Sequence, residues 1–413
     1  MPADGSPESL LERRTRRVAA LAQEIARCLG LSAVDREELE REASRRIRGN
    51  LLESKALDRL LTDLVGPDWA SRIREGPARA ANPSAPASGD SLRLQADILE
   101  VSGFFEQRIE FLPYELVTQE QILDELSGLA QEIVVNPVVL TALTSLQRVG
   151  MEQLVERVYR LPVFPLIALK ALELARSEDA DVAEIERLVS SDQVLAGRLV
   201  QAANSNLYSP ACRISSLRQA VSYIGLETAR RLLMGAVFQP LFASAGLKGL
   251  WRHSLEISEQ AERLAEVSGR VAPEEVFLAG LVHDVGRLAL LTASGEGVIA
   301  YARMLERGCE PVFAEMVLCG FDHGAAGAGV LRFWSFPEHL AQGVQDHHHP
   351  EHSESELAAI LYLAEFWSGS EEDLPSAARL RGALERAGVT WETLVSIPAP
   401  QPSGLADLLA SAA

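Results

Sequence analysis

Residues 274–291 read EEVFLAGLVHDVGRLALL, and this stretch decides the fold that we expect for the chain. The run is apolar almost all round, which predicts one buried helix, because a helix that faces water carries a polar side. His283 and Asp284 lie inside it. Buried polar groups destabilise a protein unless they are paired or bound to a metal. We therefore expect both side chains to have polar or metal partners.

Histidines gather around this stretch. All eight in the chain lie between His253 and His352, and the first 252 residues contain none. His253 falls near the start of a predicted helix, His323 at a helix start, and the run 347–349 at a helix end. Neutral imidazole and carboxylate together suit Mn, Fe and Zn, so the clustering indicates a site for a divalent metal.

The composition favours an all-α protein of more than one domain. A length of 413 residues allows two or three domains. Apolar residues make up 47% and aromatic residues only 6%, while Leu and Ala are plentiful, a mixture that favours helices. The net charge of −19 argues against nonspecific binding to nucleic acid or to an anionic membrane.

The cysteines and the hydropathy predict a cytoplasmic protein. The four cysteines show no CxxC spacing, no N-terminal run resembles a signal peptide, and no apolar stretch is long enough to span a bilayer. Buried free thiols in a reducing compartment are the expectation.

Residues 1–150 predict a first, smaller helical domain. Residues 9–31 place apolar side chains at spacings of three, four and seven, as one face of an amphipathic helix does. Residues 76–90, GPARAANPSAPASGD, predict a mobile loop, and residues 91–150 return to a helical pattern.

This first domain resembles a degenerate HD-GYP domain. The stretch ERRTRRVAALAQEIARCLGL is similar to that family's first motif, with Arg14 where the family has histidine. ILEVSGFFEQRIEFLPYELVTQEQILDEL is similar to its late helix, and ASRRIRGN stands where its HDIGK motif would be. An unrelated helical docking domain is the alternative. Without histidine, the domain is expected to be catalytically inert under either interpretation.

Residues 151–240 predict a helical bundle and carry the strongest resemblance. RLPVFPLIALKALELARSEDADVAEIERLVSSDQVLAGRLVQAANSNLYS, followed by ISSLRQAVSYIGLETARRLL, is similar to the HDOD family in motif order. We expect Asp192 to cap a helix and Asn204 to close a helix end, both in structural roles. The resemblance implies an HDOD domain over residues 151–370, with residues 241–370 as its HD-like part, in a bacterial protein.

The HD-like part is similar to the HD superfamily in the order of its polar residues. That resemblance implies these metal ligands: His253, His283, Asp284, His323, His347, His348 and Glu365. The superfamily's enzymes usually have aspartate where Glu365 stands and lysine where Arg287 stands. If the site is active, the resemblance implies catalytic roles for Asp284, which would bridge metals, and for Arg287, which would hold a phosphate.

Three functions follow as hypotheses. HHHPEHSESE (347–356) lacks the DGxGYP stretch that marks cyclic di-GMP phosphodiesterases, and the HDOD family is mostly regulatory. The first hypothesis is therefore a signal-transduction module that acts through a protein partner or a nucleotide ligand, without turnover. The second is a metal-dependent phosphohydrolase that acts on phosphomonoesters or phosphodiesters. The third is a structural hub whose histidines serve only the core. Residues 371–413 predict a C-terminal helical appendage.

Overall fold

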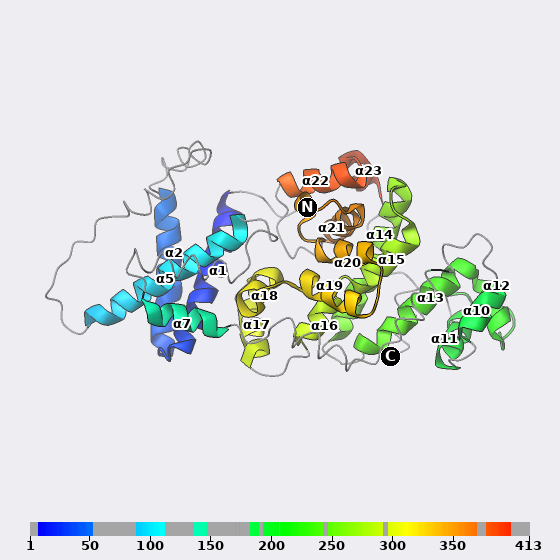
Figure 1. Cartoon of the computed structure of the whole chain (residues 1–413), viewed down its shortest axis with the longest axis horizontal. Coiled ribbons are helices and arrows are strands. Elements are labelled where there is room, and N and C mark those ends of the chain that lie inside the picture. Colours follow the sequence, from blue (N-terminus) through cyan, green and yellow to red (C-terminus); the bar gives the residue numbers. More distant parts are fainter. Residues whose placement is uncertain are drawn as a thin grey trace. The chain divides into compact units, whose positions relative to one another are not determined.

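The fold is helical throughout the part that can be described. Figure 1 shows the chain as a computed structural model. The structure describes residues 7–52, 88–111, 136–146, 170, 173, 182–189, 193–205, 207–242, 247–291, 296–369 and 377–397. Every regular element among these residues is a helix, which confirms the expected all-α class. None of the helices in these ranges has both the length and the apolar character needed to cross a membrane.

The chain divides into two compact units. Unit 1 consists of Ala3–Arg148 and Ile299–Gly320, and unit 2 consists mainly of Val149–Val298 and Phe321–Ala413. The boundary that we expect near residue 150 lies outside the described residues and stays a prediction. The sequence does not predict that residues 299–320, from the middle of the HD-like part, belong to the N-terminal unit.

Unit 1 is a small helical domain. Its helices are α1 (Pro7–Cys28), α2 (Ala33–Leu52), α5 (Ser88–Phe111), α7 (Pro137–Leu146), most of α17 (Glu296–Glu306) and α18 (Pro311–Cys319). The amphipathic helix expected from residue 9 onward is α1, and its Leu21 and Ile25 are fully buried. These two side chains share one core with Phe105 of α5 and with Phe313 of α18.

The loop expected at residues 76–90 is partly helical. Helix α5 begins at Ser88, so the last three of these residues form its first turn, and the others lie outside the described residues.

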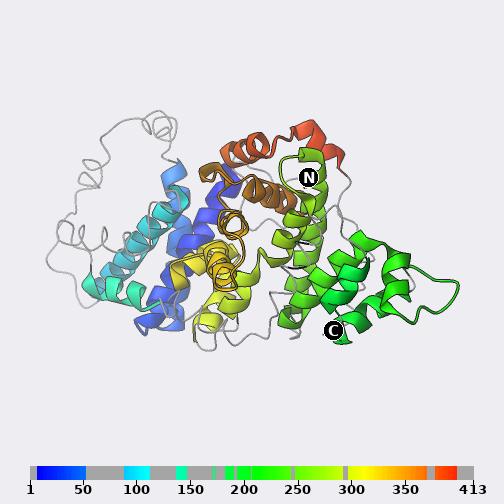
Figure 2. The ribbon, with the colours of Figure 1, turned by 45° about the vertical axis from the view of Figure 1, so that its right-hand side comes forward.

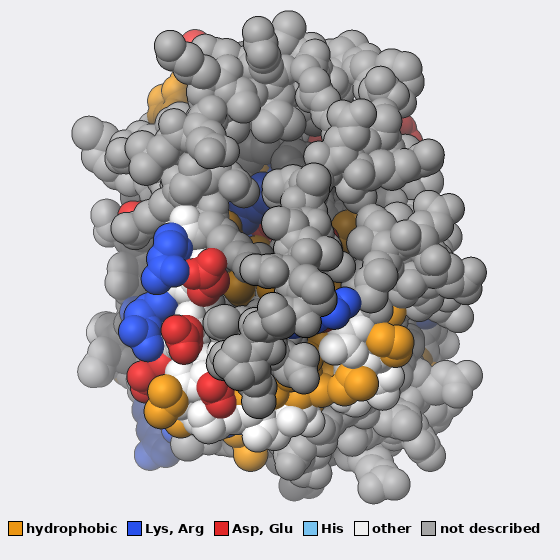
Figure 3. Space-filling view, turned by 90° about the vertical axis from the view of Figure 1, so that its left-hand side faces the viewer, with side chains coloured by type: hydrophobic (Ala, Val, Ile, Leu, Met, Phe, Trp, Pro, Cys, Tyr) orange, Lys and Arg blue, Asp and Glu red, His pale blue; other side chains and the backbone are white. Residues whose placement is uncertain are grey.

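Figure 3 shows a face of the molecule on which acidic and basic side chains lie next to each other, close to apolar ones. The described part of that face therefore carries charges of both signs.

The first part of unit 2 is a bundle of short helices, seen in green in Figures 1 and 2. Its helices are α10 (Val182–Val189), α11 (Gln193–Ala203), α12 (Leu217–Ile224) and α13 (Leu226–Phe238). The Asn204 amide closes the end of α11, because Nδ2 donates to the carbonyls of Val200 and Ile214, at 2.8 Å each. Its Oδ1 accepts from the Ile214 amide at 2.9 Å, which confirms the expected structural role. The Asp192 cap lies outside the described residues.

The second part of unit 2 holds the histidines. Its elements are α14 (Lys248–Ser268), α15 (Pro273–Val282), α16 (Val285–Leu291), α19 (His323–Phe333), α20 (Glu338–Gln345), η4 (Pro350–His352) and α21 (Glu356–Ser368). Helices α14, α15, α20 and α21 pack beside one another, as Figures 1 and 2 show. The single helix that we expect over residues 274–291 is wrong, because a turn at His283 and Asp284 separates α15 from α16. That turn lets adjacent residues both face the site.

The C-terminal segment packs onto unit 2. It contains α22 (Ala377–Ala387) and α23 (Trp391–Ser396), and α22 lies against α21 and η4. The Ser268 hydroxyl donates to the Ala387 carbonyl at 2.6 Å, and Arg379 Nε lies 3.0 Å from the Glu351 carboxylate. Helix α22 is therefore an integral part of the helical bundle.

Candidate metal centre

The residues that the sequence marks as metal ligands converge in one place in unit 2. Nitrogen and carboxylate atoms within 4.8 Å of one another form three overlapping groups. These groups are His253, His283 and Glu365; His283, Asp284 and His347; and His323, His347 and His348. Every expected ligand belongs to at least one group, although the ligands come from three helices and two turns of the chain.

The first group joins α14, the α15–α16 turn and α21. His283 Nε2 lies 3.3 Å from His253 Nε2 and 3.1 Å from Glu365 Oε1. His253 Nε2 lies 3.7 Å from the same carboxylate oxygen. Glu365 is one methylene longer than the aspartate found in related enzymes, and it still reaches both rings.

The third group joins the start of α19 to the turn after α20. His348 Nε2 lies 2.6 Å from His323 Nε2, and the rings of His347 and His348 have centroids 3.9 Å apart. Two imidazole nitrogens this close either share a proton or are neighbouring ligands of one cation. The arrangement is one that metal-ligating histidines adopt.

Asp284 belongs to the second group and lies between the first and the third. Its Oδ2 is 3.5 Å from His283 Nε2 and 3.6 Å from His253 Nε2, while its Oδ1 is 3.2 Å from His323 Nε2. Arg287 Nη1 donates to Oδ2 at 3.1 Å. The carboxylate thus has one oxygen toward each side of the cluster.

Backbone carbonyls fix the tautomers of two of the rings. His283 Nδ1 donates to the Gly280 carbonyl at 2.7 Å, and His347 Nδ1 donates to the Val344 carbonyl at 2.6 Å. Such bonds orient metal-ligating histidines and leave the Nε2 lone pair available. His347 is fully buried, and its Nε2 has no hydrogen-bond partner among the described residues. A divalent metal would satisfy this buried nitrogen, so the residues present fit such an ion.

The charges at the site are set by burial and by close neighbours. Burial lowers the pKa of His347 to about 3, with His323 and His283 adding to the effect, so this ring is neutral. Burial alone would raise the pKa of Asp284, but Arg287 and the histidines hold it well below its usual range. Burial would likewise raise the pKa of Glu365, but hydrogen bonds from His253 and His283 outweigh it. Burial alone would lower the pKa of His283, but Asp284 and Glu365 raise it. A divalent metal would therefore bind the neutral His347 and the carboxylates directly and would displace the proton that His283 shares with Glu365.

Glycines let the ligand-bearing elements approach one another. A Cβ on Gly286 would lie 2.0 Å from the His323 carbonyl oxygen and 2.6 Å from the Gly327 amide nitrogen. A Cβ on Gly324 would lie 2.8 Å from the Gln345 carbonyl oxygen. Only glycine permits these contacts, which bring the turn at Asp284 and the start of α19 together.

A polar network that the sequence does not reveal holds the histidine turn. The Asp346 carboxylate accepts from Gln342 Nε2 at 2.8 and 2.9 Å, and from the Ser353 hydroxyl at 2.5 Å. His349 is half-buried, and its Nε2 lies 3.9 Å from Asp322 Oδ2, whereas His352 is exposed. In the sequence, the only sign of this polar network is that its residues stand next to the histidine run.

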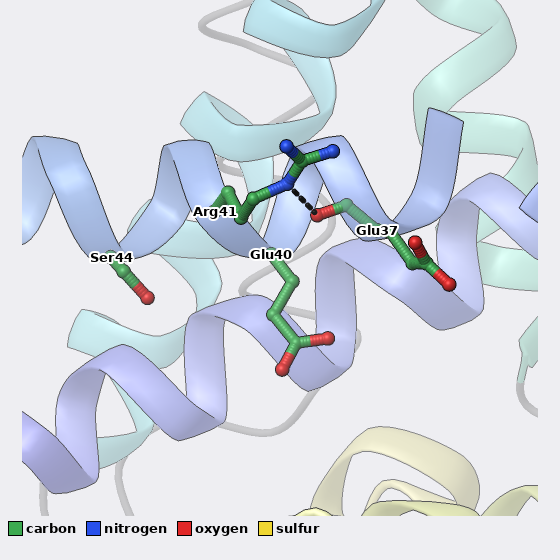
Figure 4. A pocket seen from close by; sticks show the side chains of 4 residues that line it. All are labelled: Glu37, Glu40, Arg41 and Ser44. Atoms are coloured by element: carbon green, nitrogen blue, oxygen red, sulfur yellow. Dashed lines mark hydrogen bonds between the residues drawn. The ribbon is translucent and has the colours of Figure 1, made fainter. Parts of the chain in front are cut away.

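A separate hollow of about 490 Å³ lies on α2 in unit 1 and contains none of the expected ligands. Figure 4 shows its lining residues, which are Glu37, Glu40, Arg41 and Ser44. Arg41 Nε donates to the Glu37 carbonyl at 3.4 Å, and the Glu40 carboxylate accepts from Gln23. These hydrogen bonds are made within the protein, so the polar side chains of the hollow give no reason to propose a ligand there.

Comparison with known proteins identifies the domain that carries the cluster. The HDOD domain family matches residues 161–350. A crystal structure of an HDOD domain protein of unknown function from Geobacter sulfurreducens is similar, with a TM-score of 0.51 and 26% identity over 63% of this chain and 96% of that one. A proposed signal transduction protein from Marinobacter aquaeolei VT8 shares the fold, with a TM-score of 0.50 and 22% identity over 64% of this chain and 61% of that one.

A curated relative is similar over part of its length. An uncharacterized protein from Treponema pallidum (strain Nichols) is 24% identical over 214 residues, which are 50% of this chain and 42% of the relative. This chain therefore matches less than half of that protein. The family match begins at residue 161, so the resemblance of residues 1–150 to HD-GYP domains stays a prediction. The match, the neighbouring structures and the histidine cluster together show that the chain contains an HDOD domain at residues 161–350.

Proposed function

We propose that this chain is a signal-transduction module whose HDOD domain binds a divalent metal and acts through a protein partner or a nucleotide ligand, without turnover. The observation that carries the proposal is the enclosure of the cluster. The side chains of His283, Asp284 and His323 are 0% exposed, and the most exposed ligand, His253, reaches only 18%. Catalytic metal sites keep a coordination position open for water or substrate, whereas structural sites are closed.

Arg287 supports the same proposal. Its guanidinium is 7% exposed and donates to Asp284, so it acts on the carboxylate inside the protein. An arginine that recognises a substrate phosphate would present its fork to an open cleft. In this arrangement Arg287 keeps Asp284 ionised and oriented toward the histidines.

The alternative is a metal-dependent phosphohydrolase. It is favoured by the completeness of the ligand set and by the position of Asp284 between the first and the third group. A metal in the cluster would supply hydroxide near neutral pH and neutralise phosphoryl charge. Asp284 would be held as an anion by Arg287 throughout the reaction, and His347 would stay neutral.

Metal analysis combined with a hydrolysis assay separates the two functions. We expect purified protein to retain Mn, Fe or Zn, His283→Ala to lose it, and neither protein to hydrolyse bis(p-nitrophenyl) phosphate or p-nitrophenyl phosphate. Hydrolysis by the wild type that disappears in His283→Ala would establish the enzyme instead. Absence of bound metal after expression in metal-rich medium would contradict both.

The proposed partners and location rest on charge and on the thiols. The net charge of −19 favours a protein or small nucleotide over nucleic acid and membrane surfaces. All four cysteines are free, as in a reducing cytoplasm, but Cys28 and Cys212 are exposed, so the expectation of buried thiols is wrong for these two.

A further inference from the structure

Two of the expected ligands, His347 and His348, lie in a tight turn that follows α20. The His349 amide donates to the Asp346 carbonyl at 2.8 Å. A hydrogen bond between the first and the fourth of four residues closes a β-turn, so the two ligands are its central residues. We call these four residues the histidine turn. Its first residue, Asp346, stands directly beside two ligands but belongs to none of the three groups that the ligands form.

The Asp346 carboxylate accepts hydrogen bonds from residues on both sides of the turn. Gln342 Nε2 donates to Oδ1 at 2.9 Å and to Oδ2 at 2.8 Å. The Ser353 hydroxyl donates to Oδ2 at 2.5 Å. Gln342 precedes the turn on α20, and Ser353 follows η4. The carboxylate therefore ties both flanking segments of the chain to the first residue of the turn.

The same hydrogen bonds continue to the helix that carries Glu365. Ser353 Oγ accepts from the Ser355 amide at 3.0 Å. The Ser355 hydroxyl then caps α21, because it accepts from the Ala358 amide at 3.1 Å. Asp346 and Ser353 thus join the histidine turn to the start of α21, within one unit of the structure.

The burial of Asp346 indicates that these bonds matter to the local structure. Asp346 is 8% exposed, and Ser353 is 4% exposed. A buried carboxylate is unfavourable unless hydrogen-bonded, and hydrogen bonds to a carboxylate are stronger than those between neutral groups. Displacing the turn would break bonds that are expensive to lose inside the protein.

The two histidine rings in the turn have little room for movement. His348 Nε2 lies 2.6 Å from His323 Nε2, and His347 Nδ1 lies 2.6 Å from the Val344 carbonyl oxygen. Ligands of a metal stay within about 0.2 Å of their preferred distances. A β-turn has no ladder of helix or sheet hydrogen bonds that could hold it to this accuracy. Side-chain hydrogen bonds from outside the ligand set must therefore contribute.

We infer that Asp346 is a positioning residue for the metal centre, because its carboxylate holds the turn in the shape that presents His347 and His348 to the ion. The inference rests on the proposed metal role. It assigns Asp346 no contact with the metal, since Gln342 and Ser353 already donate to its two oxygens. The affinity for a divalent metal should depend on this partnership outside the ligand set.

The test exchanges the amide and the carboxylate between positions 342 and 346 in the full-length protein. Asp346→Asn replaces an acceptor oxygen by a donor, and Gln342→Glu sets two carboxylates against each other. The double variant restores one amide and one carboxylate at the same two positions. Glu354→Gln is the matched control, because this carboxylate lies between η4 and α21 but is 96% exposed and pairs with Arg386.

Two measurements follow the effect of each variant. Titration calorimetry gives the affinity for Mn²⁺, and hydrogen–deuterium exchange of residues 344–353 without metal reports on the turn itself. We expect Asp346→Asn to bind Mn²⁺ about 10-fold to 100-fold more weakly than the wild type, which is the usual effect of losing an outer-shell partner. Gln342→Glu should also bind more weakly, because like charges repel.

The double variant should recover Mn²⁺ affinity to within about threefold of the wild type, since the two positions interact directly. Residues 344–353 should exchange faster in both single variants and at nearly the wild-type rate in the double variant. Glu354→Gln should match the wild type in both measurements.

Wild-type affinity in Asp346→Asn would overturn the inference. A loss of affinity that the double variant does not recover would overturn it too, because Asp346 would then be a ligand or a general stabilising residue. If the wild type binds no Mn²⁺, the proposed metal role fails, and the exchange of residues 344–353 still decides whether Asp346 holds the turn. Should Asp346→Asn fail to fold, Ser353→Ala removes one bond alone. It must then weaken Mn²⁺ binding and speed exchange, and no change in either would contradict the positioning role.

Discussion

At the scale of single residues, His347 carries the most specific prediction. Its Nε2 is buried and has no hydrogen-bond partner among the described residues, while Val344 fixes the other nitrogen. We expect His347→Ala to weaken Mn²⁺ binding by about 100-fold or more, since loss of a ligand exceeds the usual effect of losing an outer-shell partner. Titration calorimetry measures this. His352→Ala, in an exposed residue of the same turn, should bind like the wild type; equal affinities for all three proteins would exclude His347 as a ligand.

Glu262 on α14 should make stability depend on pH. Burial raises the pKa of Glu262 to about 8, against the opposing charge of Arg231. Between about pH 4.5 and 8 the folded state therefore holds a proton that the unfolded state has lost, and stability falls as pH rises. The slope approaches about 1.4 kcal/mol per pH unit at most.

Urea denaturation at pH 5, 6.5 and 8 tests this dependence. Glu262→Gln should show a flatter dependence than the wild type. Glu256→Gln alters an exposed ion pair with Arg252 on the same helix and should keep the wild-type slope. If Glu262→Gln loses stability as steeply as the wild type, another group governs the pH response.

At the scale of elements, close approach of α16 and α19 depends on Gly286. A Cβ there would lie 2.0 Å from the His323 carbonyl oxygen, which no small shift relieves. We expect Gly286→Ala to lower the free energy of unfolding by about 1–3 kcal/mol and to weaken metal binding, because overpacking displaces the helices. Gly249→Ala in α14 meets nothing within 4 Å and should be neutral or slightly stabilising. Thermal denaturation of both variants decides the point, and similar stabilities would show that α16 can move freely.

The elements also show how far the sequence could predict the site. The order of His253, His283 and Glu365 resembles that of the HD superfamily, and this resemblance marked them as neighbours; the need of buried imidazole and carboxylate for partners agrees with it. The break between α15 and α16 was not predictable, because residues 274–291 are apolar on both sides of His283 and hydrophobic periodicity does not report a turn there. The Asp346 network was likewise hidden, since its hydrogen bonds depend on how the turn folds back.

At the scale of the whole molecule, metal should stabilise the folded chain. A ligand at 100 times its dissociation constant adds about 2.7 kcal/mol to the free energy of unfolding. We expect Mn²⁺ to raise the melting temperature by about 3 °C, and EDTA to lower that of metal-loaded protein. His283→Ala should respond to neither. A melting temperature that is the same with Mn²⁺ and with EDTA would favour the structural-hub hypothesis.

The all-α class and the HDOD domain were predictable at this scale, because Leu- and Ala-rich amphipathic patterns and motif order are local properties of the sequence. The sharing of residues 299–320 with unit 1 was not predictable. Met304 and Phe313 read as ordinary core positions, and nothing in their spacing tells which core they enter.

The composition of unit 1 also has a consequence for biosynthesis. A ribosome that has made the first 150 residues has not yet made α17 and α18, so the emerging polypeptide carries an apolar surface that nothing yet covers. Completion of this core must wait for about 170 further residues, roughly 10–30 seconds at usual elongation rates. During that interval the nascent N-terminal segment is a natural client for chaperones.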